Sequence, residues 1–254
     1  MFYYVKRAFS ILIEEGILML IEKSFSYMFP QKWFVIKTKL NEITSKFFYN
    51  FSDDPYKTLV IDPSIIDQAL DWRKSSIKRE KYAGLGQIRA GGWDNDKFKT
   101  DIDNHWKIQG LIQRFKYNRD WEKTNYYKHL KNNLEDDKSD EEYISKRCEN
   151  YDELYRDIKK NGYKTGDVER SKRPDVGPEA CDSLEVLVAI DRDGNILLFE
   201  GYHRFAIALS LDIKIPVQVV CRHKRWLQTR QEMDKRTIGQ GKSSHPESHP
   251  DISC

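Results

Sequence analysis

The segment from residue 184 to residue 221 constrains the fold of this chain more than any other part. Two apolar runs, LEVLVAI and NILLF, flank Asp193-Gly194, a dipeptide that favours a tight turn between antiparallel strands. The sequence EGYHR then leads into an apolar helical stretch, FAIALSL, and IPVQVV is typical of a further strand. This order of strand, hairpin, strand, turn, helix and strand predicts a sheet with a helix packed on it.

The EGYHR turn combines residue types that suit a phosphate. Where a strand gives way to a helix, the backbone N–H groups at the helix N-terminus attract an anion. Glycine lets the backbone approach a ligand closely, arginine can bind a phosphate through two hydrogen bonds, and histidine can exchange a proton near neutral pH. We therefore predict a phosphate-binding turn of Gly201, Tyr202, His203 and Arg204. The structural alternative is that Arg204 pairs with Glu200 or Asp191 and His203 caps the turn.

A resemblance to a known superfamily follows from these motifs. LEVLVAIDRDGNILLFEGYHRFAIALSLDIKIPVQVV resembles the C-terminal half of ParB/sulfiredoxin-like domains, whose turn carries Gly-x-x-Arg or Gly-x-His-Arg and binds nucleotide phosphates. YDELYRDIKKNGYKTG resembles the helix that precedes this half, and TLVIDPSII resembles the opening strand. The similarity is clearest over residues 151–221, and the whole layout is similar to that of uncharacterised archaeal members.

The resemblance implies an α+β fold: a ParB/sulfiredoxin-like mixed sheet with a helical insertion and a helical N-terminal region. We expect residues 1–52 to form that N-terminal region and residues 53–236 to form the ParB/sulfiredoxin-like domain. Residues 104–165 read as helical, and the segments GGWD and DWEKT belong to the insertion. Residues 237–254 are rich in Gly, Ser, Pro and His, a composition that predicts a disordered tail.

The chain departs from each known activity of the superfamily. Sulfiredoxins use a cysteine in Gly-Gly-Cys-His-Arg, and Tyr202 stands at that position here, so repair of sulfinic acids is not expected. Chromosome-partitioning ParB proteins continue into a helix-turn-helix that reads DNA. This chain continues only with the basic stretch RHKRWLQTRQEMDKR, which could touch a nucleic-acid backbone or form a solvated helix end. Free-serine kinases use a Gly-His-Thr-Arg turn with a separate carboxylate base, which keeps phosphate transfer open.

Transfer or hydrolysis of a phosphate would require a general base or a metal-binding carboxylate near the turn. The candidates are Asp94 in GGWD, Glu200 beside the turn and Glu122 in DWEKT. We favour Asp94 because a glycine-flanked loop could reach a ligand, although Gly91-Gly92 could also be an ordinary turn with Trp93 as a packing anchor. The expected ligand is a nucleoside triphosphate with Mg²⁺ or another phosphorylated small molecule.

The sequence supports neither a zinc site nor an ordinary P-loop. No two of the four cysteines form a CxxC pair, which favours reduced thiols over a zinc site. The sequence also contains no Gly-x-x-x-x-Gly-Lys-Ser/Thr motif, so an ordinary P-loop is excluded.

Residues 1–50 are typical of two amphipathic helices. In the first, apolar residues recur at three- and four-residue spacing: Phe9, Leu12, Ile13, Ile17 and Leu20. The second, QKWFVIKTKLNEITSKFFYNF, interleaves lysines with aromatic residues. This pattern fits a segment lying on a membrane surface, and it equally fits a helical hairpin packed on the protein or on a second copy.

The overall composition sets limits on the partners. Charged residues make up 33% of the chain, but the net charge is only +3, so any nucleic-acid-binding surface would have to be local. No run of 18 apolar residues occurs, and we expect a cytoplasmic protein, with peripheral attachment to the membrane as the alternative. The expected function is nucleotide or phosphate binding, with NTPase or small-molecule kinase activity open. The alternative is a non-catalytic binding protein that contacts nucleic acid or a membrane surface.

Overall fold

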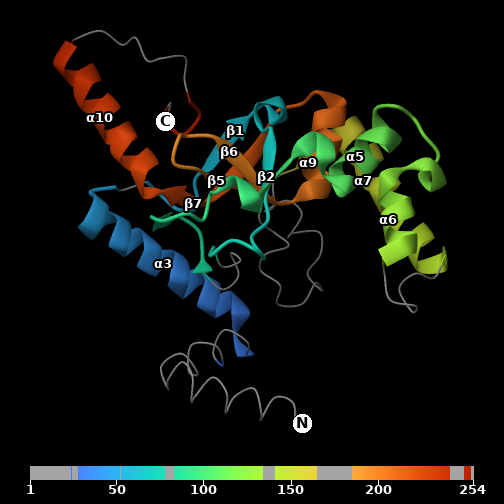
Figure 1. Cartoon of the computed structure of the whole chain (residues 1–254), viewed down its shortest axis with the longest axis horizontal. Coiled ribbons are helices and arrows are strands. Elements are labelled where there is room, and N and C mark those ends of the chain that lie inside the picture. Colours follow the sequence, from blue (N-terminus) through green and yellow to red (C-terminus); the bar gives the residue numbers. More distant parts are fainter. Residues whose placement is uncertain are drawn as a thin grey trace.

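A mixed sheet lies at the centre of the computed structural model, with helices at both ends of it (Figure 1). The structure describes Ser24 and residues 28–51, 53–77, 83–133, 141–164, 185–240 and 249–252. The predicted α+β class is confirmed. The first of the two predicted N-terminal helices lies outside the described residues.

The sheet has seven described strands, four of them from the first half of the chain and three from the predicted C-terminal unit. They are β1 (Thr58–Ile61), β2 (Gln68–Leu70), β3 (Gln87–Arg89), β4 (Lys99–Asp101), β5 (Val186–Ile190), β6 (Ile196–Glu200) and β7 (Ile215–His223). Their order is β1-β7-β5-β6-β2-β4, and β3 pairs with the second half of β7. The pairs β7–β5, β6–β2 and β3–β7 are parallel, while β1–β7, β5–β6 and β2–β4 are antiparallel.

The hairpin of β5 and β6 forms as predicted around Asp193-Gly194. Gly194 takes a φ of 94°, and the carboxylate of Asp191 accepts hydrogen bonds from the backbone N–H groups of Asp193 and Asn195. All five residues of β5 are buried, because both faces of this central strand are covered. Alternate β5 residues enter two separate hydrophobic clusters, which lie on opposite faces of the sheet.

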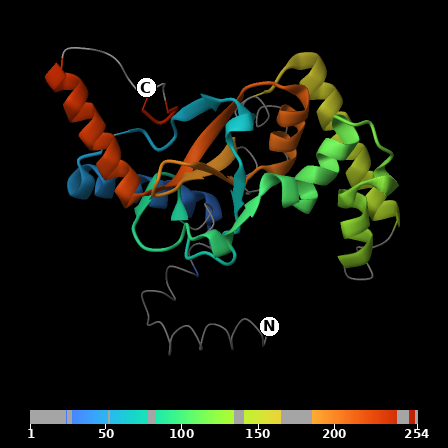
Figure 2. The same ribbon diagram turned by 45° about the horizontal axis from the view of Figure 1, so that its top comes forward.

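The helices divide between these two faces. They are α3 (Pro30–Tyr49), α5 (Trp106–Phe115), α6 (Asn125–Asn133), α7 (Glu141–Asn161), α9 (Tyr202–Leu211) and α10 (Lys224–Gln240). Phe205 of α9 and Ile108 of α5 belong to one cluster, whereas Phe34 of α3 belongs to the other. Figures 1 and 2 show α5, α6 and α7 gathered beyond α9 at one end of the molecule, with α3 and α10 at the other end.

The predicted helical segment between residues 104 and 165 contains α5, α6 and α7. The 3-10 turn η3 (Ile102–Asn104) precedes α5, and η4 (Trp121–Lys123) lies between α5 and α6; η1 (Pro63–Ile65) and η2 (Asp96–Phe98) lie earlier in the chain. Asn161-Gly162 ends α7 as predicted, with Gly162 at a φ of 76°. Among the described residues, no helix is both long enough and apolar enough to cross a bilayer.

The C-terminal part differs from the predicted disordered tail. Helix α10 continues to Gln240, and residues 249–252 pack against the domain. Asp251 is only 1% exposed and accepts hydrogen bonds from Arg222 and Trp226. The physical reason is charge: buried guanidinium groups require an anionic partner, and this carboxylate supplies it.

Candidate functional site

The turn before α9 is a tight, glycine-dependent junction. Gly201 has a φ of 88°, and a Cβ atom there would lie 3.1 Å from the Cα atom of Val186. Both the backbone conformation and the close packing on β5 therefore call for glycine. The N-cap residue of α9 is Gly201, which has no side chain with which to cap the N–H groups of the first turn.

A pocket of about 300 Å³ lies beside this turn, at the carboxyl ends of the parallel strands β2 and β6. Ligands of α/β proteins commonly bind at such strand ends. The loop after β2, the start of α5 and the end of β6 supply most of the lining. The lining residues used below are Asp71, Trp72, Arg73, Lys74, His105, Trp106, Lys107, Glu200 and Tyr202.

Two helix N-termini adjoin the pocket. Helix α9 begins at Tyr202, and α5 begins at Trp106, with His105 as an N-cap residue that makes no capping hydrogen bond through its side chain. The N-terminus of a helix carries a partial positive charge and unpaired N–H donors. Two such ends at one pocket favour an anionic ligand.

The charged side chains strengthen this preference. Arg73, Lys74 and Lys107 bring three cations to the pocket, against two carboxylates, Asp71 and Glu200. The Nζ atom of Lys74 lies 3.2 Å from Asp71, and 70% of the lysine side chain is exposed, so this pair is weak. Burial lowers the pKa of Lys107, while the charge of Glu200 acts in the opposite direction.

Aromatic rings form one wall of the pocket. His105 stacks on Tyr202 with ring centroids 4.7 Å apart, and the Nζ atom of Lys107 lies 5.4 Å from the centroid of Trp106 and 5.2 Å from that of Tyr202. Burial lowers the pKa of His105 to about 4, so the ring is neutral at pH 7. Its Nδ1 atom is buried and has no hydrogen-bond partner within the described part of the chain.

The predicted turn residues do not all face this pocket. Tyr202 and Glu200 line it, whereas His203 and Arg204 are absent from its lining. His203 stacks on Tyr151 of α7 at 4.2 Å, and its Nε2 atom is buried without a partner among the described residues. Burial, together with the charges of Lys107, Arg147 and Arg204, lowers the pKa of His203 to about 3.

This environment excludes the proton exchange near neutral pH that we predicted for His203, because the ring stays neutral at that pH. Arg204 lies close enough to Tyr163 to influence it. Burial raises the pKa of Tyr163 to about 12, and the charge of Arg204 opposes that rise.

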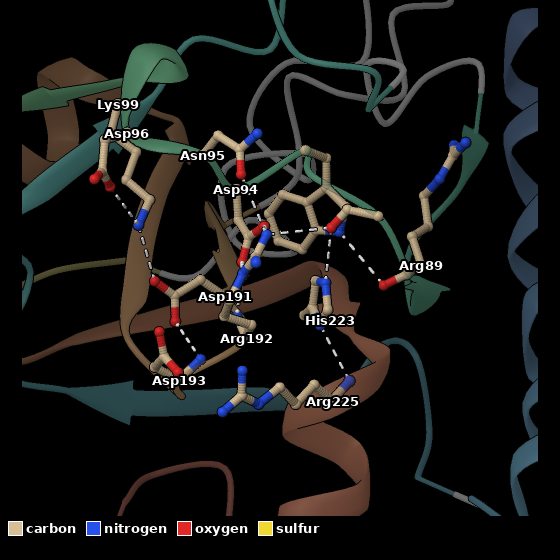
Figure 3. A network of polar contacts seen from close by, with 12 residues as sticks. Arg89, Asp94, Asn95, Asp96, Lys99, Asp191, Arg192, Asp193, His223 and Arg225 are labelled. Atoms are coloured by element: carbon tan, nitrogen blue, oxygen red, sulfur yellow. Dashed lines mark hydrogen bonds and ion pairs between the residues drawn. The ribbon is translucent and has the colours of Figure 1, made fainter.

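Asp94 does not approach the turn. Its carboxylate is 1% exposed and accepts hydrogen bonds from the backbone N–H and the Nε atom of Arg192, both at 2.9 Å (Figure 3). Arg192 lies in the β5–β6 hairpin turn, at the opposite end of the five-residue strand β6 from Glu200, a separation of roughly 16 Å along the strand. The predicted approach is therefore wrong, because a buried carboxylate pairs with the nearest cation.

The neighbours of Asp94 fit the packing alternative for GGWD. Trp93 is 1% exposed and joins the cluster on the α3 face, while the carbonyl oxygen of Gly91 lies 3.0 Å from Nε2 of His223. In Figure 3 these groups form one network with Lys99 and Asp191. Glu122, the remaining candidate, is exposed on η4 and does not line the pocket.

Sequence reasoning missed the cations that the structure brings together. Residues 71–74 line the pocket because they directly follow β2. The sequence Asp-Trp-Arg-Lys directly after a strand was the available signal. Lys107 carried no signal, because its place depends on where α5 begins. Among the described residues, no cluster of three or more His, Cys, Asp or Glu side chains could hold a metal ion.

The basic stretch after β7 is also partly buried. Of the four basic residues from 222 to 230, Arg222 and Arg230 are 7% and 8% exposed and pair with Asp251. These two charges are unavailable to a nucleic-acid backbone. No protein-family model, no curated protein and no solved structure matches the chain.

Proposed function

We propose that the pocket at the ends of β2 and β6 binds a phosphorylated small molecule, with a nucleotide as the first candidate. The observation that carries this proposal is the meeting of two helix N-termini, whose N-cap residues make no side-chain capping bond, with three basic side chains at one pocket. Phosphate groups are recognised by this combination of oriented N–H donors and cations.

The remaining lining suits the rest of a nucleotide. Trp72 and Trp106 add aromatic surface to the lining, although the His129 ring already stacks on Trp106 with centroids 3.7 Å apart. A volume of about 300 Å³ lies at the lower end of the range for small-molecule sites, which favours a mononucleotide over a dinucleotide.

The resemblance to ParB/sulfiredoxin-like domains supports the same ligand class, and membership of that superfamily is part of the proposal. The strand-turn-helix of β6, Gly201 and α9 corresponds to the element that binds nucleotide phosphates in that superfamily. The position of Arg204 outside the pocket lining is a departure from the pattern, and Lys107 takes over the cationic role in this proposal.

The two carboxylates leave hydrolysis or transfer of a phosphate open. Glu200 and Asp71 lie in the pocket lining, where one could serve as a general base and either could bind Mg²⁺ that arrives with the phosphates. Binding without catalysis is the second candidate, because the same groups suffice to hold a ligand.

The test is a titration of ATP, ADP, CTP and GTP, with and without Mg²⁺, in which binding is measured as the increase in thermal stability. A ligand at 100 times its Kd should add about 2.7 kcal/mol of stability. Lys107→Met keeps the length of the side chain and removes its charge, so affinity should fall about 10- to 150-fold. Lys214→Met, in the connection between α9 and β7 where the side chain is exposed, is the matched control and should bind as the wild type does.

Three results would separate the alternatives. A folded Lys107→Met variant with unchanged affinity would refute this pocket as the binding site. Turnover by the wild type that disappears in Glu200→Gln, with binding retained, would identify a nucleotide-consuming enzyme. A wild-type protein that binds a nucleotide and never consumes it would establish the binding function alone.

A further inference from the structure

Helix α3 is anchored to the domain through one of its faces. Asn41 donates hydrogen bonds to the carbonyl oxygens of Ala83 and Leu85, both at 2.8 Å, and Thr38 accepts one from the N–H of Leu85. Phe34 on the same face is 5% exposed. This face fixes which residues of α3 point away from the protein.

The opposite face of α3 is apolar and exposed. Its residues follow the three- and four-residue spacing of a single helical face, and we call them the outer stripe: Ile36, Leu40, Ile43 and Phe47. Their exposed fractions are 42%, 47%, 43% and 82%, in that order. A soluble surface seldom leaves so continuous an apolar row open to water, which indicates an interaction site.

A row of lysines runs along one edge of the outer stripe. Lys32, Lys39 and Lys46 are seven residues apart, and 64% of the Lys39 side chain and 50% of the Lys46 side chain are exposed. Glu42 is the one acidic residue of α3 and pairs with Lys39 and Lys46. With four lysines and one glutamate, the helix carries a net charge of +3.

We propose that the outer stripe docks α3 on an anionic lipid surface. A helix lying in the interface buries its apolar face at the boundary of the acyl chains and places its lysines among the headgroups. The net positive charge complements acidic lipids. A second copy fits less well, because an antiparallel α3 would bring the two lysine rows together. The proposal does not depend on the pocket, since α3 covers the other face of the sheet from α9.

Flotation of the full chain with vesicles tests this proposal. Neutral vesicles contain phosphatidylcholine alone, and anionic vesicles also contain phosphatidylserine. The wild type should float with anionic vesicles, and raising the salt should weaken that binding. Lys32→Gln/Lys39→Gln/Lys46→Gln should bind anionic vesicles about 100-fold more weakly, at roughly fivefold per lysine.

Two further variants make the test specific. Ile43→Ser/Phe47→Ser should reduce binding about tenfold per residue, because each exposed apolar side chain loses its burial in the interface. Tyr117→Ser is the control, since this side chain is 61% exposed and follows α5, a helix that Figure 1 shows at the other end of the molecule from α3. The control should float as the wild type does, and thermal unfolding should show that all variants are folded.

Light scattering in solution tests whether a second copy of the chain, and not a lipid surface, covers the outer stripe. A wild-type dimer that the Ile43→Ser/Phe47→Ser change turns into a monomer, with no flotation, would overturn the proposal in favour of a second copy. A wild-type monomer that stays out of both kinds of vesicle would also overturn it. Equal binding to neutral and anionic vesicles would refute the role of the lysine row.

Discussion

Asp251→Asn tests whether residues 249–252 are a structural part of the domain. The Asp251 carboxylate receives hydrogen bonds from Arg222 at 2.6, 3.0 and 3.1 Å and from the Trp226 indole at 3.0 Å, and Arg230 lies 3.5 Å away. The Asp251 and Arg222 side chains are 1% and 8% exposed. Asparagine keeps the shape of the side chain but leaves Arg222 without its counter-charge, whereas Arg230 keeps Asp53 as a partner at 2.9 Å.

The expected loss follows from this burial. Removing one partner of a buried ion pair typically costs about 3–5 kcal/mol, because the remaining charge stays desolvated. For a domain of this size the loss corresponds to a fall in Tm of roughly 6–20 °C. Asp193→Asn is the matched control, since Asp193 is exposed in the neighbouring β5–β6 turn, and the loss there should stay within about 0.5 kcal/mol.

Urea unfolding at several pH values provides the assay. Burial tends to raise the pKa of Asp251, but the charge of Arg222 and the bonds from Arg222 and Trp226 outweigh it and lower that pKa. A carboxylate with a lowered pKa stabilises the fold fully above about pH 4, and that stability is lost as the pH falls through the folded-state pKa. Asp251→Asn should therefore also flatten the acid decline. An Asp251→Asn protein as stable as the Asp193→Asn control would refute this account of the C-terminal segment.

Three further predictions concern the site and its surroundings. Asp94→Asn should lower the free energy of unfolding only modestly, because Arg192 loses a charged partner but is itself 34% exposed and stays solvated, and should leave nucleotide affinity unchanged in a titration; lost affinity with full stability would contradict the placement of Asp94. Gly201→Ala should destabilise the fold by about 1–3 kcal/mol in urea, because a Cβ would crowd Val186 at a φ of 88°, and an unaltered midpoint would count against that geometry. Thermal unfolding measured from pH 7 to pH 4 should show stability falling below about pH 6.5, because His203 becomes protonated in the unfolded chain but stays neutral when buried in the folded protein. His203→Gln should make this fall in stability with pH less steep, and an unchanged pH dependence would rule out His203 as its source.

The C-terminal unit could be predicted from sequence because its signals are local. Asp193-Gly194 fixes the hairpin, and the turn at Gly201 fixes where β6 ends and α9 begins. Strands β2, β3 and β4 have three residues each, too few to show an alternating pattern, so only their partners in the sheet define them.

The candidate site was predictable only in part, for the same reason. Glu200 and Tyr202 belong to the local turn motif and do line the pocket. Arg73 and Lys107 reach it through a parallel strand pairing and a helix start that no short motif encodes. Asp94 was misplaced because a glycine-flanked carboxylate looks the same in sequence whether it meets a ligand or a buried arginine.

The arrangement of β7 also bears on the order of folding. Its first half pairs with β1 and its second half with β3, so both early strands depend on one strand more than 130 residues further along the chain. By contrast, β5, β6, α9 and β7 are consecutive and can assemble through short connections. Closing long loops is costly before their contacts form, which makes such pairings slow. We expect residues 186–223 to form a template early, onto which β1 and β3 then add as late edge strands.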